Sequence, residues 1–177
     1  MQAATEKARL RAELLAARRA RPAGDVEIAR AAVRERVLRQ ARLDGWTCVA
    51  AYEPLRTEPG SIELLAGLAA LGVRVLVPIT QPDRDLDWTV WGADGDGLGP
   101  AAIATADAVL VPALAVARDG TRLGRGGGSY DRALRRARPA APRIALLFDG
   151  ELVAALPREE WDEPVTEVVT PAGPIRL

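Results

Sequence analysis

The chain has 177 residues with 24 basic and 24 acidic side chains, no histidine and one cysteine. This length, with 49% apolar residues, predicts a soluble globular protein with a single domain over residues 1–177. The lack of histidine argues against a zinc or haem site and removes every Ser–His or Cys–His nucleophile. The lone Cys48 cannot form an internal disulfide. We therefore expect chemistry based on carboxylates, arginines, backbone amides and the single lysine, Lys7.

Hydropathy predicts no membrane segment. No apolar run reaches the roughly 18–20 residues that a membrane helix needs, because Asp107 and Pro112 interrupt the best stretch. The first twenty residues carry several charges and do not resemble a signal peptide. We expect a cytoplasmic protein.

The N-terminal third predicts a pair of helices. Residues 3–20 are rich in Ala, Leu, Arg and Glu, and Lys7, Arg11 and Leu14 follow one helical face. Lys7 and Arg11 should therefore lie at the edge of a cleft. The simpler alternative is that Lys7, the one lysine beside 23 arginines, has survived by chance on a solvent-exposed helix. A second helix is expected over residues 25–43, with Asp25 as its cap.

From residue 45 on, short apolar runs alternate with helical patterns, which predicts an α/β sheet covered on both faces. Proline is expected to stop the strand that precedes Pro78. Trp88 and Trp91 share one face of a predicted strand that could line a ligand cleft. The predicted strands cover residues 47–52, 73–77, 86–91, 108–111, 114–117, 143–148 and 165–169. The predicted helices cover residues 61–71 and 130–137, with a helical turn over 151–156.

The most informative stretch is Arg-Leu-Gly-Arg-Gly-Gly-Gly-Ser-Tyr-Asp-Arg, residues 122–132. Four glycines in five positions let backbone N–H groups surround an anion, and the helix that follows directs its N-terminus at the same place. The motif is neither a Walker A loop nor a dinucleotide fingerprint. A flexible surface loop is the competing interpretation. In that case Ser129 is only a helix N-cap, and Asp131 only an acid in the first helical turn.

These residues, in this order, resemble the 5-formyltetrahydrofolate cyclo-ligase (5,10-methenyltetrahydrofolate synthetase) family. The resemblance begins with Lys7-Ala-Arg-Leu-Arg11, continues through Tyr52 and Glu58, and includes Val111-Pro112 and the glycine-rich motif. It ends with residues 146–151, Leu156-Pro157, Asp162 and Thr170. The family implies a three-layer α/β/α sandwich with a mostly parallel central sheet.

The resemblance also implies a reaction and its ligands. The family uses ATP and Mg²⁺ to close 5-formyltetrahydrofolate to 5,10-methenyltetrahydrofolate, releasing ADP and phosphate. It implies Lys7 and Arg122 as catalytic residues and Asp131 and Asp162 as ligands of Mg²⁺. It implies folate contacts by Glu58 and by the position of Glu53, although Glu58 read alone is a solvated loop acid. The residues implied for ATP are Lys7, Arg11, Arg122, Gly124, Arg125, Gly126, Gly127, Gly128, Ser129 and Tyr130.

Several positions depart from the family pattern. Val116-Ala117 stands where a Phe-Asp pair is frequent, Ser129 replaces an aromatic residue, and Trp161 stands where histidine is frequent before the aspartate. These differences leave open an alternative function, a paralogue that binds nucleotide with a regulatory role or acts on another formyl or imino substrate. We expect a monomer with a reduced folate as its small-molecule partner.

Two other interpretations were weighed. The spacing of Asp83, Asp85 and Asp87 is that of a calcium loop, but position six is Trp88 rather than glycine. The basic run over residues 135–138 lacks interleaved aromatic residues in a protein of zero net charge, so we expect no nucleic-acid partner.

Overall fold

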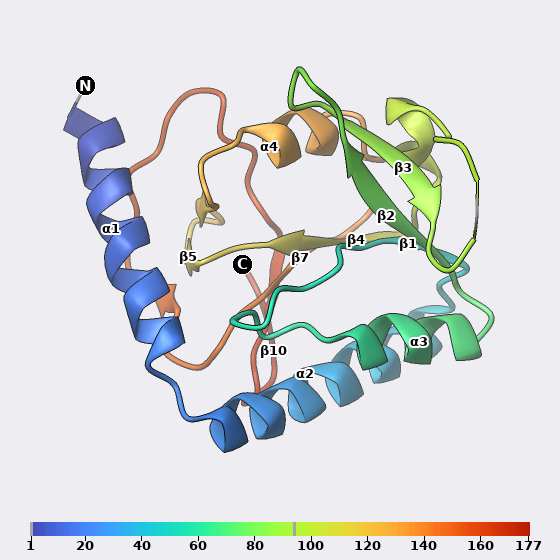
Figure 1. Ribbon diagram of the computed structural model, residues 1–177, viewed down its shortest axis with the longest axis horizontal. Helices are drawn as coiled ribbons and strands as arrows, with labels where there is room; N and C mark the ends of the chain where they lie inside the picture. The colour runs from blue at the N-terminus through green and yellow to red at the C-terminus, as the bar shows by residue number, and fades with distance from the viewer. Residues whose placement is uncertain (1, 94) are drawn as a thin grey trace.

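A mixed, mostly parallel β-sheet organises the chain, of which the computed structural model describes residues 2–93 and 95–177. Within these residues seven strands pair in the order β10-β9-β7-β4-β1-β2-β3 (Figure 1). The five central strands are parallel, whereas β10 and β3 are antiparallel edge strands. The strands are β1 (Cys48–Ala50), β2 (Arg74–Thr80), β3 (Leu86–Val90), β4 (Ala108–Pro112), β7 (Arg143–Leu146), β9 (Glu167–Val169) and β10 (Pro174–Arg176).

Helices cover both faces of this sheet, as an α/β sandwich requires. Alternate residues of the central strands face opposite cores, as Val49 and Ala50 of β1 do. One core contains side chains of α2 (Ala23–Asp44) and α3 (Ile62–Ala70), which lie together below the sheet in Figure 1. The other contains side chains of α4 (Ser129–Leu134) and of the short 3₁₀ helix η1 (Pro100–Thr105). The expected α/β fold with a mostly parallel sheet is confirmed.

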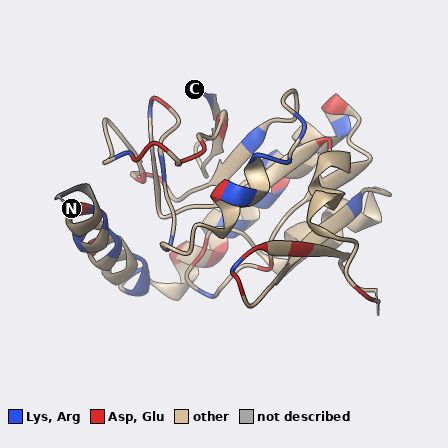
Figure 2. Ribbon diagram, turned by 90° about the horizontal axis from the view of Figure 1, so that it is seen from above, with Lys and Arg blue, Asp and Glu red and all other residues tan. Residues whose placement is uncertain are grey.

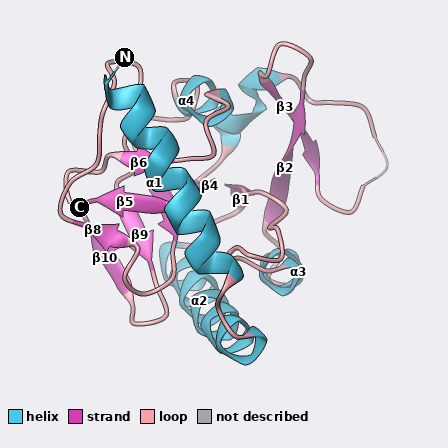
Figure 3. Ribbon diagram, turned by 60° about the vertical axis from the view of Figure 1, so that its left-hand side comes forward, coloured by secondary structure: helices cyan, strands magenta, loops and turns pink. Residues whose placement is uncertain are grey.

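A second, small sheet supports the N-terminal helix. It has the order β6-β5-β8 within the described chain and consists of β5 (Ala115–Ala117), β6 (Arg122–Leu123) and β8 (Leu152–Val153). Helix α1 (Gln2–Arg19) crosses in front of this sheet in Figure 3. The helix is rich in basic side chains (Figure 2), and two of them, Lys7 and Arg18, are buried. Polar contacts therefore dominate the attachment of α1 to the rest of the protein.

The expectation that Pro78 stops its strand is wrong. Strand β2 continues through Pro78 to Thr80 and pairs with β3 along that stretch. The backbone of Leu76 faces β1, since its carbonyl accepts from Ala51 N, and Pro78 has the same orientation two residues later. Pairing with β1 ends at Leu76, so a backbone N–H at position 78 would have no strand partner on that side. Proline, which lacks this N–H, therefore removes no hydrogen bond from the sheet.

Three local expectations also need correction. The residues predicted as a helical turn after Glu151 form strand β8 instead, because Leu152 and Val153 pair with β5. Asp25 is not a cap: α2 begins at Ala23, and Asp25 lies in its first turn. The N-cap of α4 is Gly128, with φ 70°, and Ser129 is the first helical residue. In addition, β10 was not predicted.

None of the helices in the described ranges is both long enough and apolar enough to cross a membrane.

Candidate functional site

A cleft of about 330 Å³ lies at the carboxyl ends of β1, β2 and β4. After β1, the chain adds β2 on one side of this strand and later adds β4, β7 and β9 on the other side. The strand order therefore reverses between β1 and β4. In open α/β sheets ligands bind at such a switch point. Every residue predicted for the site except Glu53 lines this cleft: Lys7, Arg11, Glu58, Arg122, Gly124, Arg125, Gly126, Gly127, Gly128, Ser129, Tyr130, Asp131 and Asp162.

The glycine loop, residues 124–128, forms part of the cleft wall between β6 and α4. Gly126 has φ +100°, and a Cβ there would lie 3.3 Å from Arg11 Cζ. A Cβ on Gly124 would lie 2.6 Å from Arg122 Nη1. Side chains at these two positions would thus displace the arginines, so glycine is needed for the close approach of backbone and guanidinium groups.

Arg122 is one of the buried cations of the site. Its Nη2 donates to Asp131 Oδ1 at 2.9 Å, and its Nη1 donates to the carbonyl of Pro112 at 3.3 Å. Its buried Nε has no hydrogen-bond partner within the described chain. A buried guanidinium with an unused donor is costly unless a ligand completes its hydrogen bonds.

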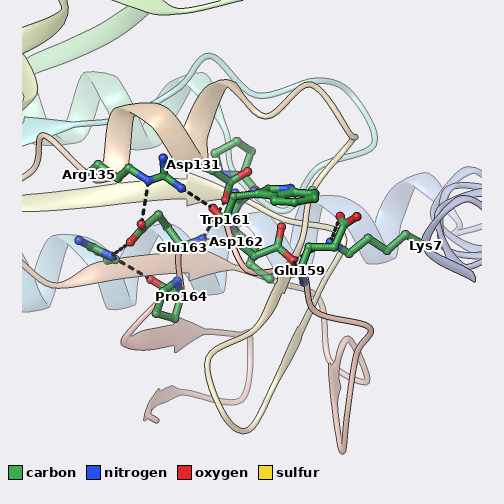
Figure 4. A network of polar contacts seen from close by, with 12 residues as sticks. Lys7, Asp131, Arg135, Glu159, Trp161, Asp162, Glu163 and Pro164 are labelled. Atoms are coloured by element: carbon green, nitrogen blue, oxygen red, sulfur yellow. Dashed lines mark hydrogen bonds and ion pairs between the residues drawn. The ribbon is translucent and has the colours of Figure 1, made fainter. Parts of the chain in front are cut away.

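Lys7 enters the cleft from α1 and is buried there. Its Nζ donates to Glu159 Oε2 at 2.7 Å and to Asp162 Oδ2 at 2.6 Å (Figure 4). Asp162 Oδ2 also accepts from the backbone N–H of Glu159 at 2.8 Å. The alternative that Lys7 is a solvated helix residue is therefore wrong.

Two arginines continue the inward face of α1. Arg11 Nε donates to the carbonyl of Gly124 at 2.8 Å, which ties α1 to the glycine loop. Arg18 makes a bidentate pair with Glu151, Nε to Oε1 at 2.8 Å and Nη2 to Oε2 at 2.7 Å. Its Nη2 also donates to the carbonyl of Ala113 at 2.7 Å. Arg18 therefore fixes the far end of the helix that carries Lys7 and Arg11.

Glu58 is a buried carboxylate that lines the cleft from the loop after β1. Its Oε2 accepts from the backbone N–H of Leu55 at 2.9 Å, and its Oε1 accepts from Arg125 Nε at 3.4 Å. Arg30 of α2 holds the same turn by donating to the carbonyls of Leu55 and Glu58. Glu53, in contrast, is exposed and does not line the cleft.

Two tyrosines lie close to Glu58. Burial raises the pKa of Tyr52 well above its ordinary value, and the negative charge of Glu58 raises it further. Burial likewise raises the pKa of Tyr130, against the lowering effect of Arg122. Both phenols therefore stay protonated at neutral pH. The buried hydroxyl of Tyr130 has no hydrogen-bond partner among the described residues, so it is free to serve a ligand.

Asp131 and Asp162 both line the cleft, and the sequence predicts both as ligands of Mg²⁺. The hydrogen bonds of Asp131 use Oδ1, which accepts from Arg122 and from the backbone N–H of Glu163 at 3.2 Å. Those of Asp162 use Oδ2. No group of three or more acidic, histidine or cysteine side chains within the described ranges could hold a metal unaided. A bound Mg²⁺ would thus need water or phosphate oxygens to complete its coordination.

Some residues of the site were not foreseen from the sequence. Glu159 and Trp161 both line the cleft, whereas the expected pair Trp88 and Trp91 does not, and Trp88 is fully buried. The position of Glu159 three residues before Asp162 was the available signal for a shared turn. Nothing in the sequence signalled the pairing of Arg18 with Glu151.

The positions that depart from the family pattern lie in different surroundings. Val116 and Ala117 are fully buried in β5 and do not line the cleft. Ser129 and Trp161 do line it. The Val-Ala pair therefore belongs to the buried interior around β5 rather than to the cleft wall.

The fold and the cleft together define an α/β protein with a glycine-rich, arginine-lined cleft, and comparisons with known proteins give its family. The model of the 5-formyltetrahydrofolate cyclo-ligase family matches residues 3–171. A protein of Mycolicibacterium smegmatis named 5-formyltetrahydrofolate cyclo-ligase is 40% identical over 183 residues, covering 93% of each chain.

Solved structures agree on the fold. A 5,10-methenyltetrahydrofolate synthetase from Mycoplasma pneumoniae superposes with a TM-score of 0.81 at 20% identity, covering 94% of this chain and 99% of the other. One from Aquifex aeolicus gives 0.74 at 23% identity, covering 97% and 92%. The chain belongs to the 5-formyltetrahydrofolate cyclo-ligase family and is an enzyme of the ligase class.

Proposed function

We propose that this enzyme catalyses the ATP-dependent cyclisation of 5-formyltetrahydrofolate to 5,10-methenyltetrahydrofolate, with release of ADP and phosphate. The observation that carries the proposal is the convergence of unlike groups in one cleft. Cations and glycine amides suited to phosphate, two carboxylates suited to Mg²⁺, and the separate buried carboxylate Glu58 all line it. Family membership supplies the substrate class.

ATP would bind along the glycine loop. The backbone N–H groups of the loop and the cations Lys7, Arg11 and Arg122 are the donors that phosphate oxygens need. The unused Nε of Arg122 supports this fit, because a phosphate oxygen would satisfy a buried donor. Ser129 and Tyr130 would complete this side of the site.

Mg²⁺ fits the carboxylate pair. Asp131 and Asp162 would hold it with oxygens that their protein hydrogen bonds leave available. When bound, the ion would neutralise charge on the phosphates. The two aspartates are held in position by ion pairs. Arg122 pairs with Asp131, and Lys7 pairs with Asp162.

The folate would bind at the Glu58 end. A buried carboxylate accepts hydrogen bonds from the donor edge of a pterin, which fixes the orientation of the ring. Arg125, 3.4 Å from Glu58 in this structure, is 45% exposed in its side chain and can move aside for the substrate. Glu53 lies outside this cleft, which favours Glu58 alone as the folate carboxylate.

The proposed reaction has two steps. The formyl oxygen attacks the γ-phosphorus of ATP, the bond from that phosphorus to the bridging oxygen breaks, and ADP leaves. N10 then attacks the activated formyl carbon and loses its proton, and the bond from carbon to the phosphorylated oxygen breaks, expelling phosphate. The protein contributes position and charge neutralisation, which are the main demands of phosphoryl transfer.

An isotope experiment tests this sequence. With ¹⁸O in the formyl group, the mechanism delivers the label to inorganic phosphate, which mass spectrometry detects. Methenyl product formed with unlabelled phosphate would refute phosphorylation of the formyl oxygen. Labelled phosphate that requires both ATP and Mg²⁺ would support it.

A further inference from the structure

Trp161 presents an aromatic ring to the cleft that the roles proposed above leave unused. It lines the cleft and is 58% exposed, whereas Trp46 is 7% and Trp88 0% exposed. An exposed indole at the wall of a polar cleft offers a large apolar face to a ligand. Its position next to Asp162 brings this face close to the proposed phosphate and metal groups.

The backbone around Trp161 is held from both sides. Asp162 N donates to the carbonyl of Glu159 at 3.1 Å, and Glu159 N donates to Asp162 Oδ2 at 2.8 Å, so the two residues close a turn. From the other side, Arg135 Nη2 of the segment after α4 donates to the carbonyl of Trp161 at 3.0 Å (Figure 4). Hydrogen bonds thus fix the turn that carries the ring. Ordering this backbone would cost a ligand little binding free energy.

The glycine loop relates this turn to Glu58 through contacts on its two sides. Glu58 contacts Arg125, at the start of the glycine loop. Past the loop, Asp131 of α4 accepts from the backbone N–H of Glu163, two residues after Trp161. The glycine loop therefore joins a residue that contacts Glu58 to a helix that contacts the segment after Trp161.

We propose that Trp161 stacks on the purine base of the nucleotide, an inference that rests on the proposed function. With phosphates on the glycine loop and the folate at Glu58, the base is assigned to the part of the cleft wall that Trp161 forms beside Asp162. Every purine has a π face, so this contact supplies affinity without selecting between bases.

Calorimetric titration without folate tests the contact. Mg-ATP and Mg-tripolyphosphate, which lacks a base, are each titrated into the wild type, Trp161→Ala and Trp161→Phe. We expect Trp161→Ala to weaken Mg-ATP binding roughly tenfold, within the range of single base–aromatic stacks, and to weaken Mg-GTP by a similar factor. Tripolyphosphate binding should not change, and Trp161→Phe should recover most of the ATP affinity.

Intrinsic fluorescence gives an independent readout. Mg-ATP should quench the emission of the wild type and of the control variant Trp91→Phe, whose replaced ring lies outside the cleft. The quenching should be lost in Trp161→Phe. Quenching that persists in Trp161→Phe would overturn the stacking contact.

The remaining outcomes are also decisive. Equal weakening of ATP and tripolyphosphate in Trp161→Ala would mean that the residue only supports the turn. Weakened 5-formyltetrahydrofolate binding with unchanged ATP binding would assign the ring to the pterin. Either result overturns the inference while leaving the proposed function intact. A wild type that binds neither ATP nor tripolyphosphate would instead overturn the proposed function, and this inference with it.

Discussion

Lys7 Nζ lies 2.6 Å from Asp162 Oδ2, although 155 positions separate the two residues in the chain. The pair joins the first helix to the turn that precedes β9, and Glu159 adds a second carboxylate at 2.7 Å. The chain has only this lysine, and its charge lies inside the cleft rather than on the helix surface. A phosphate that reaches the cleft would therefore meet an ammonium group already oriented by two acids.

Replacing Lys7 with alanine should weaken ATP use by roughly 2–5 kcal/mol, because a desolvated charge against phosphate is lost. The measurement is kcat/KM for ATP. Arg9→Ala is the matched control, since Arg9 lies on the same helix and its exposed side chain pairs with Glu13, away from the cleft lining. Arg9→Ala should stay near the wild-type value. Equal turnover in the wild type and in Lys7→Ala would contradict the role of Lys7.

Gly126→Ala should raise the KM for ATP, because a side chain at φ +100° strains the loop and displaces Arg11. Backbone strain of this kind costs about 1–3 kcal/mol, or roughly 5- to 150-fold in binding if the loop distorts. Gly24→Ala in α2 is the control: a Cβ there meets nothing within 4 Å, so stability should rise by about 0.4–1 kcal/mol. Steady-state kinetics and chemical denaturation measure the two effects. A KM for ATP unchanged in Gly126→Ala would show that the loop tolerates a side chain.

Arg18→Ala should destabilise the protein by about 3–5 kcal/mol, because it leaves the carboxylate of Glu151 buried without its partner. Replacing both residues by apolar ones, as in Arg18→Met with Glu151→Leu, should cost less than the sum of the single changes. Urea denaturation of the wild type, Arg18→Met, Glu151→Leu and the double variant measures the coupling free energy between the two side chains. Additive losses would mean that the pair does not hold α1 in place.

Asp107 should make stability depend on acid pH. The backbone N–H of Thr47 is the main cause that lowers the pKa of Asp107, and the N–H of Cys48, the Thr47 hydroxyl and Arg138 contribute further. A depressed pKa gives stabilisation that is complete above the unfolded value of about 3.9 and is lost as pH falls toward the folded value. The wild type should therefore exceed Asp107→Asn in stability by a constant margin above about pH 5. The margin should shrink below about pH 4, and a margin independent of pH would refute this.

The sequence was sufficient for the parts of this protein that depend on local pattern. The change from helical to strand-like periodicity near residue 45 predicts the α/β fold, and the clustered glycines predict the loop beside α4. The stripe of Lys7, Arg11 and Leu14 predicts which face of α1 turns inward. These signals are local because side-chain spacing reports directly on helix and strand geometry.

Other features depend on contacts that sequence spacing does not encode. Arg18 and Glu151 are 133 positions apart, and only the folded chain brings them together. The two residues of strand β8 are too few to show a strand period, and their pairing with β5 decides their conformation. The role of Glu159 follows from the turn it shares with Asp162. Tertiary contacts decided each of these cases.

The most direct test of the central claim mixes the purified protein with ATP, MgCl₂ and 5-formyltetrahydrofolate and follows the near-ultraviolet absorbance of the methenyl product. We predict a rise that requires both ATP and Mg²⁺ and that is strongly reduced in Lys7→Ala. A flat trace from folded protein that still binds ATP would contradict cyclo-ligase activity on this substrate and would favour a nucleotide-binding paralogue.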